Sequence, residues 1–301
     1  MSLIAPRRPI AYRRRASPLH AARASIAAAY GAAIATAALL TEHPLMLAAL
    51  LLGVLAAGGA AGVGGELTRA ALSTALPLAL LSVLVNVLVS RGGLTVFARL
   101  GDWGVLGQVN LTVEAVLYGL DFALRLLIVT LACLLVFCAA DPDELLFAVR
   151  RVSPRSALTA ALATRLLPVL GADARRLAEA QRSRPDGGAG GVRGRLAILR
   201  ATVGGALDRS LDVAAVLELR GYGARGRGPA ARRPLSRHDL AFAASGAAIL
   251  ALALIGALGS LAPFHTYPLI SLPLSAGWIV LSLLSVLVAG VPFLDRRGIE
   301  P

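Results

Sequence analysis

Residues 192–223 read VRGRLAILRATVGGALDRSLDVAAVLELRGYG, and they form the second of two arginine-rich, amphipathic runs within the stretch 153–223. Apolar residues recur in this run at intervals of three and four, the spacing of one helical face. They are Leu196, Leu199, Val203, Leu207, Leu211, Ala214 and Leu217. The run ends at Leu219-Arg220-Gly221, where Gly221 suits a helix C-cap. The pattern predicts a long helix that carries Arg220 at its carboxyl end.

The first run has the same construction. Its apolar residues also follow a helical spacing, and they are Leu158, Leu162, Leu166, Val169, Leu170 and Leu177. Pro168 lies inside the run and predicts a kink. The run ends at Arg182-Ser183-Arg184, before Pro185 and a glycine-rich connector. Each helix therefore ends on an arginine, which either complements the helix dipole or projects toward a partner.

On both sides of this stretch the chain is very apolar. Hydrophobic residues make up 57% of the sequence, charged residues only 16%, and the mean hydropathy is +0.73, all of which indicate an integral membrane protein. All 30 basic residues are arginine, and 18 of them lie in 141–237. Because arginines beside apolar segments are typical of membrane topology and anionic lipid, we expect the lipid bilayer as a partner and no nucleic acid.

Six apolar segments have about the length that a membrane-spanning helix needs. They are residues 24–41, 45–63, 70–89, 114–139, 239–260 and 272–293. The first two are rich in alanine and glycine, a composition that suits close helix packing but weakens insertion. These two segments therefore form either two spans or one re-entrant pair.

The placement of arginine predicts the topology. With the amino terminus inside the cell, six crossings leave only Arg91 and Arg99 in the outer loops, which satisfies the positive-inside rule. The predicted fold class is an all-α integral membrane protein of about six transmembrane helices with a cytoplasmic pair of long amphipathic helices. The predicted parts are a basic cytoplasmic tail (1–23), transmembrane helices 1–4 (24–140), the cytoplasmic helix pair (141–237), transmembrane helices 5 and 6 (238–294) and a cytoplasmic tail (295–301).

Four polar residues lie inside or at the ends of the predicted spans. Asp121 and Arg125 are four apart with the acid first, so they are expected to pair on one helical face, which Glu114 shares. Asn86 lies in the third span. Polar groups inside a membrane indicate one of two roles: a path for protons or ions, or a structural pair that fixes helix packing. Because Asp121 and Arg125 can satisfy each other, the structural role is favoured.

Signals for catalysis are weak in this sequence. The chain contains no lysine and therefore no Walker A motif. Cys133 and Cys138 are five apart, do not share a helical face and are expected to be packing residues. The acidic cluster 141–144 fits a helix start, with Asp141 as the cap and Pro142 in the first turn. We expect no catalytic residue, metal site or cofactor, and thus a protein that is not an enzyme.

A series of landmarks in residues 40–295 resembles the transmembrane T component of energy-coupling factor (ECF) transporters, the family that includes the cobalt permease of this type. The landmarks are Asn86-Val87-Leu88, Gly92-Gly93, Leu94-Thr95, Thr112-Val113-Glu114-Ala115, Tyr118-Gly119-Leu120, Ala123-Leu124-Arg125-Leu126, Asp141-Pro142-Asp143-Glu144-Leu145-Leu146, Arg165-Leu166-Leu167-Pro168, Ala180-Gln181-Arg182-Ser183-Arg184 and Leu219-Arg220-Gly221-Tyr222-Gly223. Each landmark alone is weak, and their order is what makes the resemblance specific.

The resemblance implies roles for the two helix ends. In that family two cytoplasmic coupling helices each end in an Ala-Arg-Gly-like triplet, and each arginine enters a groove on one of two ATPase subunits. Ser183-Arg184-Pro185 and Leu219-Arg220-Gly221 occupy these positions here, with Ser and Leu in place of Ala and Pro in place of the first Gly. The implied ATPase-coupling residues are Arg184, Ser183, Arg220 and Gly221, and Arg182 competes with Arg184 for the first role.

The resemblance further implies the coupling subunit of an ECF-type ABC importer in the bacterial inner (plasma) membrane. Its partners would be two ABC ATPase subunits, which hydrolyse ATP, and a small hydrophobic substrate-binding membrane subunit for a vitamin or a transition-metal ion. Two other classes remain open. One is a self-contained ABC-importer permease or secondary transporter, which needs a polar path through its own helices. The other is a membrane-embedded enzyme such as a lipid head-group transferase.

Overall fold

The computed structural model describes residues 12, 15–89, 95–102, 108–149, 154–183, 192–222, 234–259, 275–295 and 297. Apart from one two-stranded ribbon, the regular structure of these residues is helical, which confirms the predicted all-α fold class. The chain divides into two compact units. We call Met1–Leu145 with Leu235–Pro301 the membrane unit, and Leu146–Pro234 the arginine-rich unit.

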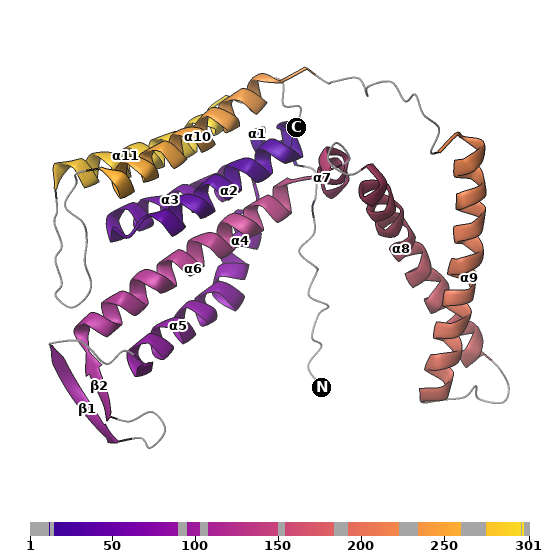
Figure 1. The fold of residues 1–301 in the computed structure, drawn as a ribbon, viewed down its shortest axis with the longest axis horizontal. Helices are drawn as coiled ribbons and strands as arrows, with labels where there is room; N and C mark the ends of the chain where they lie inside the picture. The colour runs from indigo at the N-terminus through magenta and orange to yellow at the C-terminus, as the bar shows by residue number, and fades with distance from the viewer. Residues whose placement is uncertain are drawn as a thin grey trace. The chain divides into compact units, whose positions relative to one another are not determined.

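The membrane unit is built from packed apolar helices (Figure 1). The elements are α1 (Pro18–Ala21), α2 (Ala24–Leu40), α3 (Pro44–Ala60), α4 (Gly64–Ala70), a π-helical turn (Ala71–Ala75), α5 (Leu76–Val89), α6 (Val113–Ala139), the first half of α7 (Pro142–Val149), α10 (Arg237–Leu258), α11 (Ala276–Gly290) and a 3-10 turn (Val291–Phe293). Helix α2 packs against α6 and α10, α3 packs against α6 and α11, and α5 packs against α6.

Among the described residues, each of the six predicted apolar segments overlaps a helix. Four helices of the described chain are long and apolar enough to cross a membrane, namely Gly64–Val89, Val113–Ala139, Arg237–Leu258 and Ala276–Phe293. The protein is therefore a multi-pass membrane protein. Helices α2 and α3 are apolar but have 17 residues each. At 1.5 Å per residue each reaches roughly 25 Å, the lower limit for a span.

The helix that contains the third predicted segment, 70–89, begins earlier than the sequence predicted. It runs from Gly64 to Val89 through the π-helical turn. This turn ends two residues before Pro77, whose missing N–H cannot bond the carbonyl of Ser73 one turn earlier. A local change of helical pitch at such a position is a common way to keep a helix continuous around a proline.

Small residues and aromatic rings hold the membrane helices together. The buried ring of Tyr30 meets Phe242 edge-on at a centroid distance of 5.3 Å, and its hydroxyl donates to the carbonyl oxygen of Ala289 at 2.8 Å. A Cβ added to Gly31 of α2 would overlap Val136 of α6, so these two helices meet at a position that admits no side chain. Close approach through small residues is the usual basis of helix packing in lipid.

The loop between the third and fourth spans contains a ribbon that the sequence did not predict. Strands β1 (Val96–Asp102) and β2 (Gln108–Thr112) pair antiparallel, with two register irregularities. The backbone N–H of Thr95 donates to the Glu114 carboxylate at 3.1 Å, and the N–H of Val113 donates to the carbonyl oxygen of Thr95 at 3.2 Å. These bonds fix the ribbon to the first turn of α6.

The arginine-rich unit consists of two long helices, α8 (Pro154–Arg182) and α9 (Val192–Leu219), which pack on each other. Pro168 lies inside α8, which is one helix from end to end. Both terminal guanidinium nitrogens of Arg209 lie 3.2 Å from Oδ2 of Asp173, so an ion pair joins the two helices.

Candidate functional site

The end of α9 is closed by two backbone hydrogen bonds. Gly221 has φ +73°, in the left-handed region that glycine adopts without strain. The N–H of Tyr222 donates to the carbonyl oxygen of Leu217 at 2.9 Å, and the N–H of Gly221 donates to that of Glu218 at 2.8 Å. This pair of bonds is the Schellman motif. Gly221 is thus the C-cap that its sequence position predicted, and Arg220 is the last residue before the chain turns.

The side chain of Arg220 is exposed beside this cap. Within the described residues no ion pair engages its guanidinium. The cap fixes the backbone at Arg220 while its charged fork faces outward. An arginine held in this way presents several N–H donors in a planar arrangement that matches a carboxylate.

The end of α8 has a different closure. The backbone N–H and the hydroxyl of Ser183 both donate to the carbonyl oxygen of Glu179 at 3.1 Å. The serine side chain therefore ties the last turn back on itself. Arg182 is exposed at the end of α8. Arg184 and Pro185 lie outside the described residues, so the choice between Arg182 and Arg184 stays a prediction.

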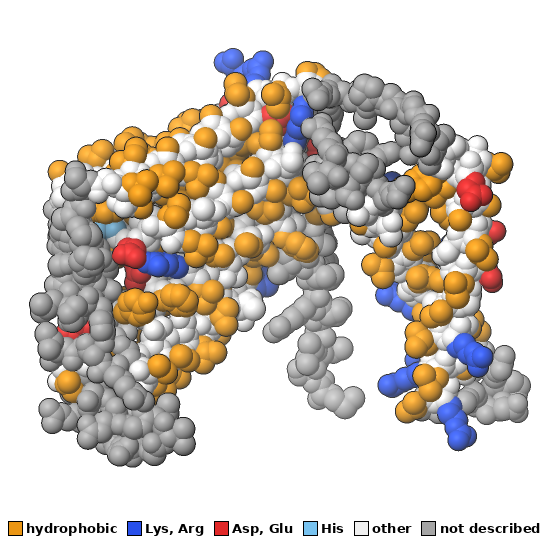
Figure 2. All heavy atoms as spheres, viewed as in Figure 1, with side chains coloured by type: hydrophobic (Ala, Val, Ile, Leu, Met, Phe, Trp, Pro, Cys, Tyr) orange, Lys and Arg blue, Asp and Glu red, His pale blue; other side chains and the backbone are white. Residues whose placement is uncertain are grey.

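The apolar stripe predicted for α9 is largely exposed, and α9 meets α8 along another line. Leu207 and Leu211 have 61% and 69% of their surface exposed. The half-buried residues of α9 instead include Ile198, Thr202, Ala206, Arg209 and Val213, and Arg209 bonds Asp173 of α8. We call Leu196, Leu199, Val203, Leu207 and Leu211 the α9 stripe; Figure 2 shows hydrophobic side chains along this helix. Fully burying one leucine contributes about 1.5–3 kcal/mol, so the stripe is a strong candidate for a contact surface.

The four intramembrane polar residues do not converge on one site. Asp121 and Arg125 form the ion pair that their spacing predicts, with 2.9 Å between Oδ2 and a terminal nitrogen; their side chains are 10% and 21% exposed. Glu114 is buried, and its carboxylate accepts the N–H of Thr95. The side-chain amide of Asn86 donates to the carbonyl oxygen of Ser82 in its own helix at 3.1 Å. Each of these groups thus has a local partner.

The two cysteines of α6 lie in different surroundings. Cys133 is exposed, whereas Cys138 is buried in the core of the membrane unit. They therefore do not share a face of the helix, as the five-residue spacing predicted.

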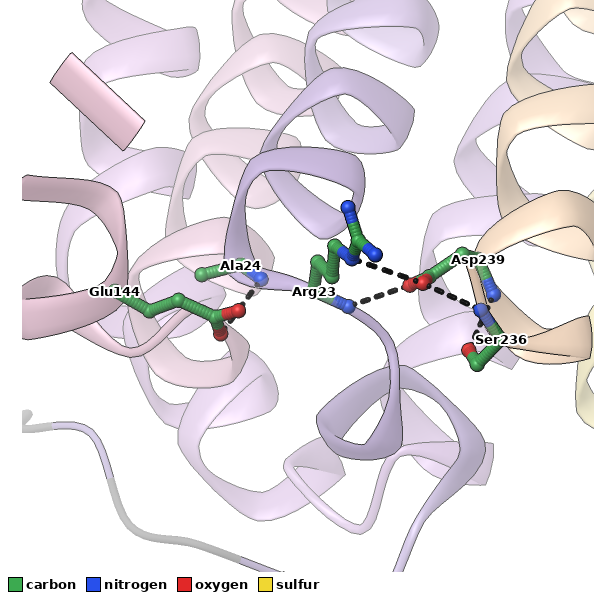
Figure 3. Close-up of polar contacts among 5 residues, drawn as sticks. All are labelled: Arg23, Ala24, Glu144, Ser236 and Asp239. Carbon is green, nitrogen blue, oxygen red and sulfur yellow. Dashed lines mark hydrogen bonds and ion pairs between the residues drawn. The ribbon is translucent and has the colours of Figure 1, made fainter. Parts of the chain in front are cut away.

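A polar cluster at the start of α2 was missed by the sequence analysis (Figure 3). The backbone N–H of Arg23 donates to Oδ1 of Asp239 at 2.8 Å, and Nε of Arg23 lies 3.2 Å from Oδ2. Asp239 also forms a capping box with Ser236 at the start of α10. The N–H of Ala24 donates to the Glu144 carboxylate of α7 at 3.1 Å. We call these five residues the α2 junction.

One part of the α2 junction was readable from the sequence. A serine followed three residues later by an acid, before an apolar run, is the pattern of a capping box, and Ser236 and Asp239 show it. The bond between Arg23 and Asp239 had no such signal, because 216 positions separate the two residues.

Comparison with protein families gives one match. The family model CbiQ, described as "Cobalt transport protein", matches residues 15–229, which include α1 through α9 and both helix ends described above. Among curated proteins, none matches this chain. The family match extends over more than half of the sequence, and it contains the ordered landmarks that resemble ECF T components. The chain therefore belongs to the CbiQ cobalt transport protein family, the family of ECF T components.

Proposed function

We propose that this chain is the transmembrane coupling subunit of an ECF-type ABC importer. It joins two ABC ATPase subunits to a separate, small hydrophobic substrate-binding membrane subunit, and it transmits the ATP-driven movement of the first to the second. ATP hydrolysis takes place in the ATPases. Recognition of the substrate, a vitamin or a transition-metal ion, takes place in the substrate-binding subunit. The family match to cobalt transport proteins supports a transition-metal ion, rather than a vitamin, as the substrate.

The observation that best supports this function is the geometry at the carboxyl end of α9. Arg220 is exposed next to a Schellman cap, which holds the backbone in one conformation. Because the cap already fixes the backbone, little conformational entropy is lost when Arg220 binds a carboxylate in an ATPase groove. Most of the free energy of the charge-assisted hydrogen bonds then contributes to affinity. Arg184, or its neighbour Arg182, supplies the second contact at the end of α8.

The exposed α9 stripe supports a second contact surface on the same helix. Five large apolar residues on one face favour an apolar partner, and the substrate-binding subunit is such a partner. Movement of α9 by an ATPase at Arg220 then reaches the stripe directly, because one rigid helix carries both. The positive-inside rule supports placing residues 141–237 and both termini in the bacterial cytoplasm, on the side where ATP is available.

Co-purification tests this function. A tagged chain is isolated from its native membranes in mild detergent, and the associated ABC ATPases are identified and quantified by mass spectrometry. We expect the wild-type chain to retain both ATPases, and the double variant Arg184→Ala/Arg220→Ala to lose them while it still inserts and folds. If the double variant keeps the ATPases and supports uptake, the two arginines do not couple the subunits.

A further inference from the structure

Both chain connections between the two units pass through the α2 junction. The arginine-rich unit spans Leu146–Pro234. Just before it, Glu144 binds the N–H of Ala24. Just after it, Ser236 caps α10 together with Asp239, and Asp239 binds Arg23. Two consecutive residues, Arg23 and Ala24, therefore hold the chain on both sides of the unit (Figure 3).

The contact that Asp239 makes at the start of α10 is buried, and both of its carboxylate oxygens accept hydrogen bonds. The side chain of Asp239 is 2% exposed. Its Oδ1 accepts the backbone N–H of Arg23 at 2.8 Å, and its Oδ2 accepts the backbone N–H of Ser236 at 2.9 Å and faces Nε of Arg23. Hydrogen bonds to a charged acceptor that is shielded from water are short and strong, so this contact is stiff.

Helix α2 passes from this junction into the centre of the membrane unit. Its buried residues face α6 and α10, and Tyr30, two turns from the junction, bonds the backbone of α11. Closely packed helices move as rigid bodies rather than deform along their length. A displacement at Arg23 and Ala24 is thereby shared with three other helices.

We propose that the start of α2 is the point where movement of the arginine-rich unit enters the membrane unit, with Asp239 and Glu144 as its positioning residues. This inference rests on the proposed function, because the ATPases supply the movement. Asp239 holds the connection through α10 by accepting the backbone N–H of Arg23, and Glu144 holds the connection through α7 by accepting the backbone N–H of Ala24.

A second ion pair of the membrane unit serves as the matched control. Arg15 contacts the carbonyl oxygen of Gly62 and the carboxylate of Glu66, at the turn between α3 and α4. This pair also ties the segment before α2 to the membrane unit, but it involves neither chain connection to the arginine-rich unit. Loss of Arg15 therefore reports what a purely structural ion pair contributes.

Hydrogen–deuterium exchange on the complex with its ATPases tests the inference. Exchange is compared with and without Mg²⁺ and a non-hydrolysable ATP analogue, in peptides from residues 28–36 of α2 and 205–219 of α9. We expect nucleotide to change exchange in both regions of the wild-type complex. Asp239→Ala combined with Glu144→Ala removes both carboxylates, and it should reduce the change in α2 at least threefold and leave the change in α9 intact. Arg15→Ala should alter neither change.

A conservative variant distinguishes loss of the contact from a general folding defect. Glu144→Gln keeps an oxygen that can accept the N–H of Ala24, so its α2 response should remain, whereas the response of Glu144→Ala should fall. The inference is wrong if α2 does not respond in the wild type, or if its response survives in the combined variant. A wild-type chain that binds no ATPase would instead overturn the proposed function itself, and the inference with it.

Discussion

Tyr222 and Leu217 are joined by a backbone hydrogen bond of 2.9 Å that crosses the left-handed Gly221 and ends α9. Any residue with a Cβ is strained in this conformation by roughly 1–2 kcal/mol. We expect Gly221→Ala to loosen the cap and weaken ATPase binding about 5- to 30-fold, because Arg220 is no longer held in one position. The affinity of purified ATPases for the chain in nanodiscs provides the measurement.

A second glycine of α9 gives the control for this substitution. A Cβ at Gly204 would meet no atom within 4 Å. Gly204→Ala should therefore stabilise the helix by about 0.5–1 kcal/mol and leave ATPase affinity unchanged. Equal loss of affinity in both variants would mean that the cap has no special role.

Replacement of Arg220 by alanine should weaken ATPase association and uncouple hydrolysis from uptake. Truncating one partner of a buried charged pair removes about 2–5 kcal/mol, which is roughly thirtyfold to more than a thousandfold in affinity. The second arginine in the same complex partly offsets a single loss. Arg220→Lys should restore little, because lysine lacks the planar fork. Titration of the ATPases against each variant measures the effect.

The first coupling arginine is identified by comparing two neighbours. Arg184→Ala is expected to behave like Arg220→Ala, and Arg182→Ala to have a smaller effect. Arg182 is the last residue of α8 and exposed, so its removal should not disturb the fold. If Arg182→Ala is the more damaging change, Arg182 is the coupling residue and the triplet begins earlier than predicted.

The pair of Asp121 and Arg125 is expected to be structural. Asp121→Asn leaves a mostly buried guanidinium without its counter-charge, which should lower the free energy of unfolding by about 3–5 kcal/mol. Thermal unfolding in detergent measures this loss, and Asp121→Asn with Arg125→Gln should recover part of it. A single variant that is fully stable yet transports nothing would instead assign the pair to the transport path.

The topology is tested by a cysteine in the connector between α8 and α9. Cys133 and Cys138 are first replaced by alanine, and Gly188→Cys then supplies one thiol. We expect a membrane-impermeant maleimide to label it in inverted vesicles but not in intact cells, because the positive-inside rule places this region in the cytoplasm. Labelling in intact cells would reverse the predicted orientation.

Features that depend on neighbours in the chain were predictable. The apolar segments could be predicted as helices, because a run of about 20 apolar residues in lipid must satisfy its backbone hydrogen bonds internally. Gly221 could be predicted as a helix cap, because that role depends only on the preceding helical turn. One boundary differed, since the helix predicted from residue 70 begins at Gly64, in a turn whose polar residues Glu66 and Arg69 hydrophobicity alone does not mark as helical.

Features that depend on distant residues were not predictable. Hydrophobic spacing on α9 identified an apolar face, but it did not reveal that Arg209, rather than Leu207, lies toward α8. The contact of Arg23 with Asp239 joins residues that are 216 positions apart, and local sequence carries no signal for it.

The α2 junction also bears on how this chain is assembled. Because Glu144 and Asp239 bind adjacent residues of α2, the two ends of the membrane unit that flank the arginine-rich unit lie side by side. Neighbouring ends are what allow one domain to be inserted into another without disturbing the host. The arginine-rich unit is thus an insertion between two neighbouring ends of the membrane unit.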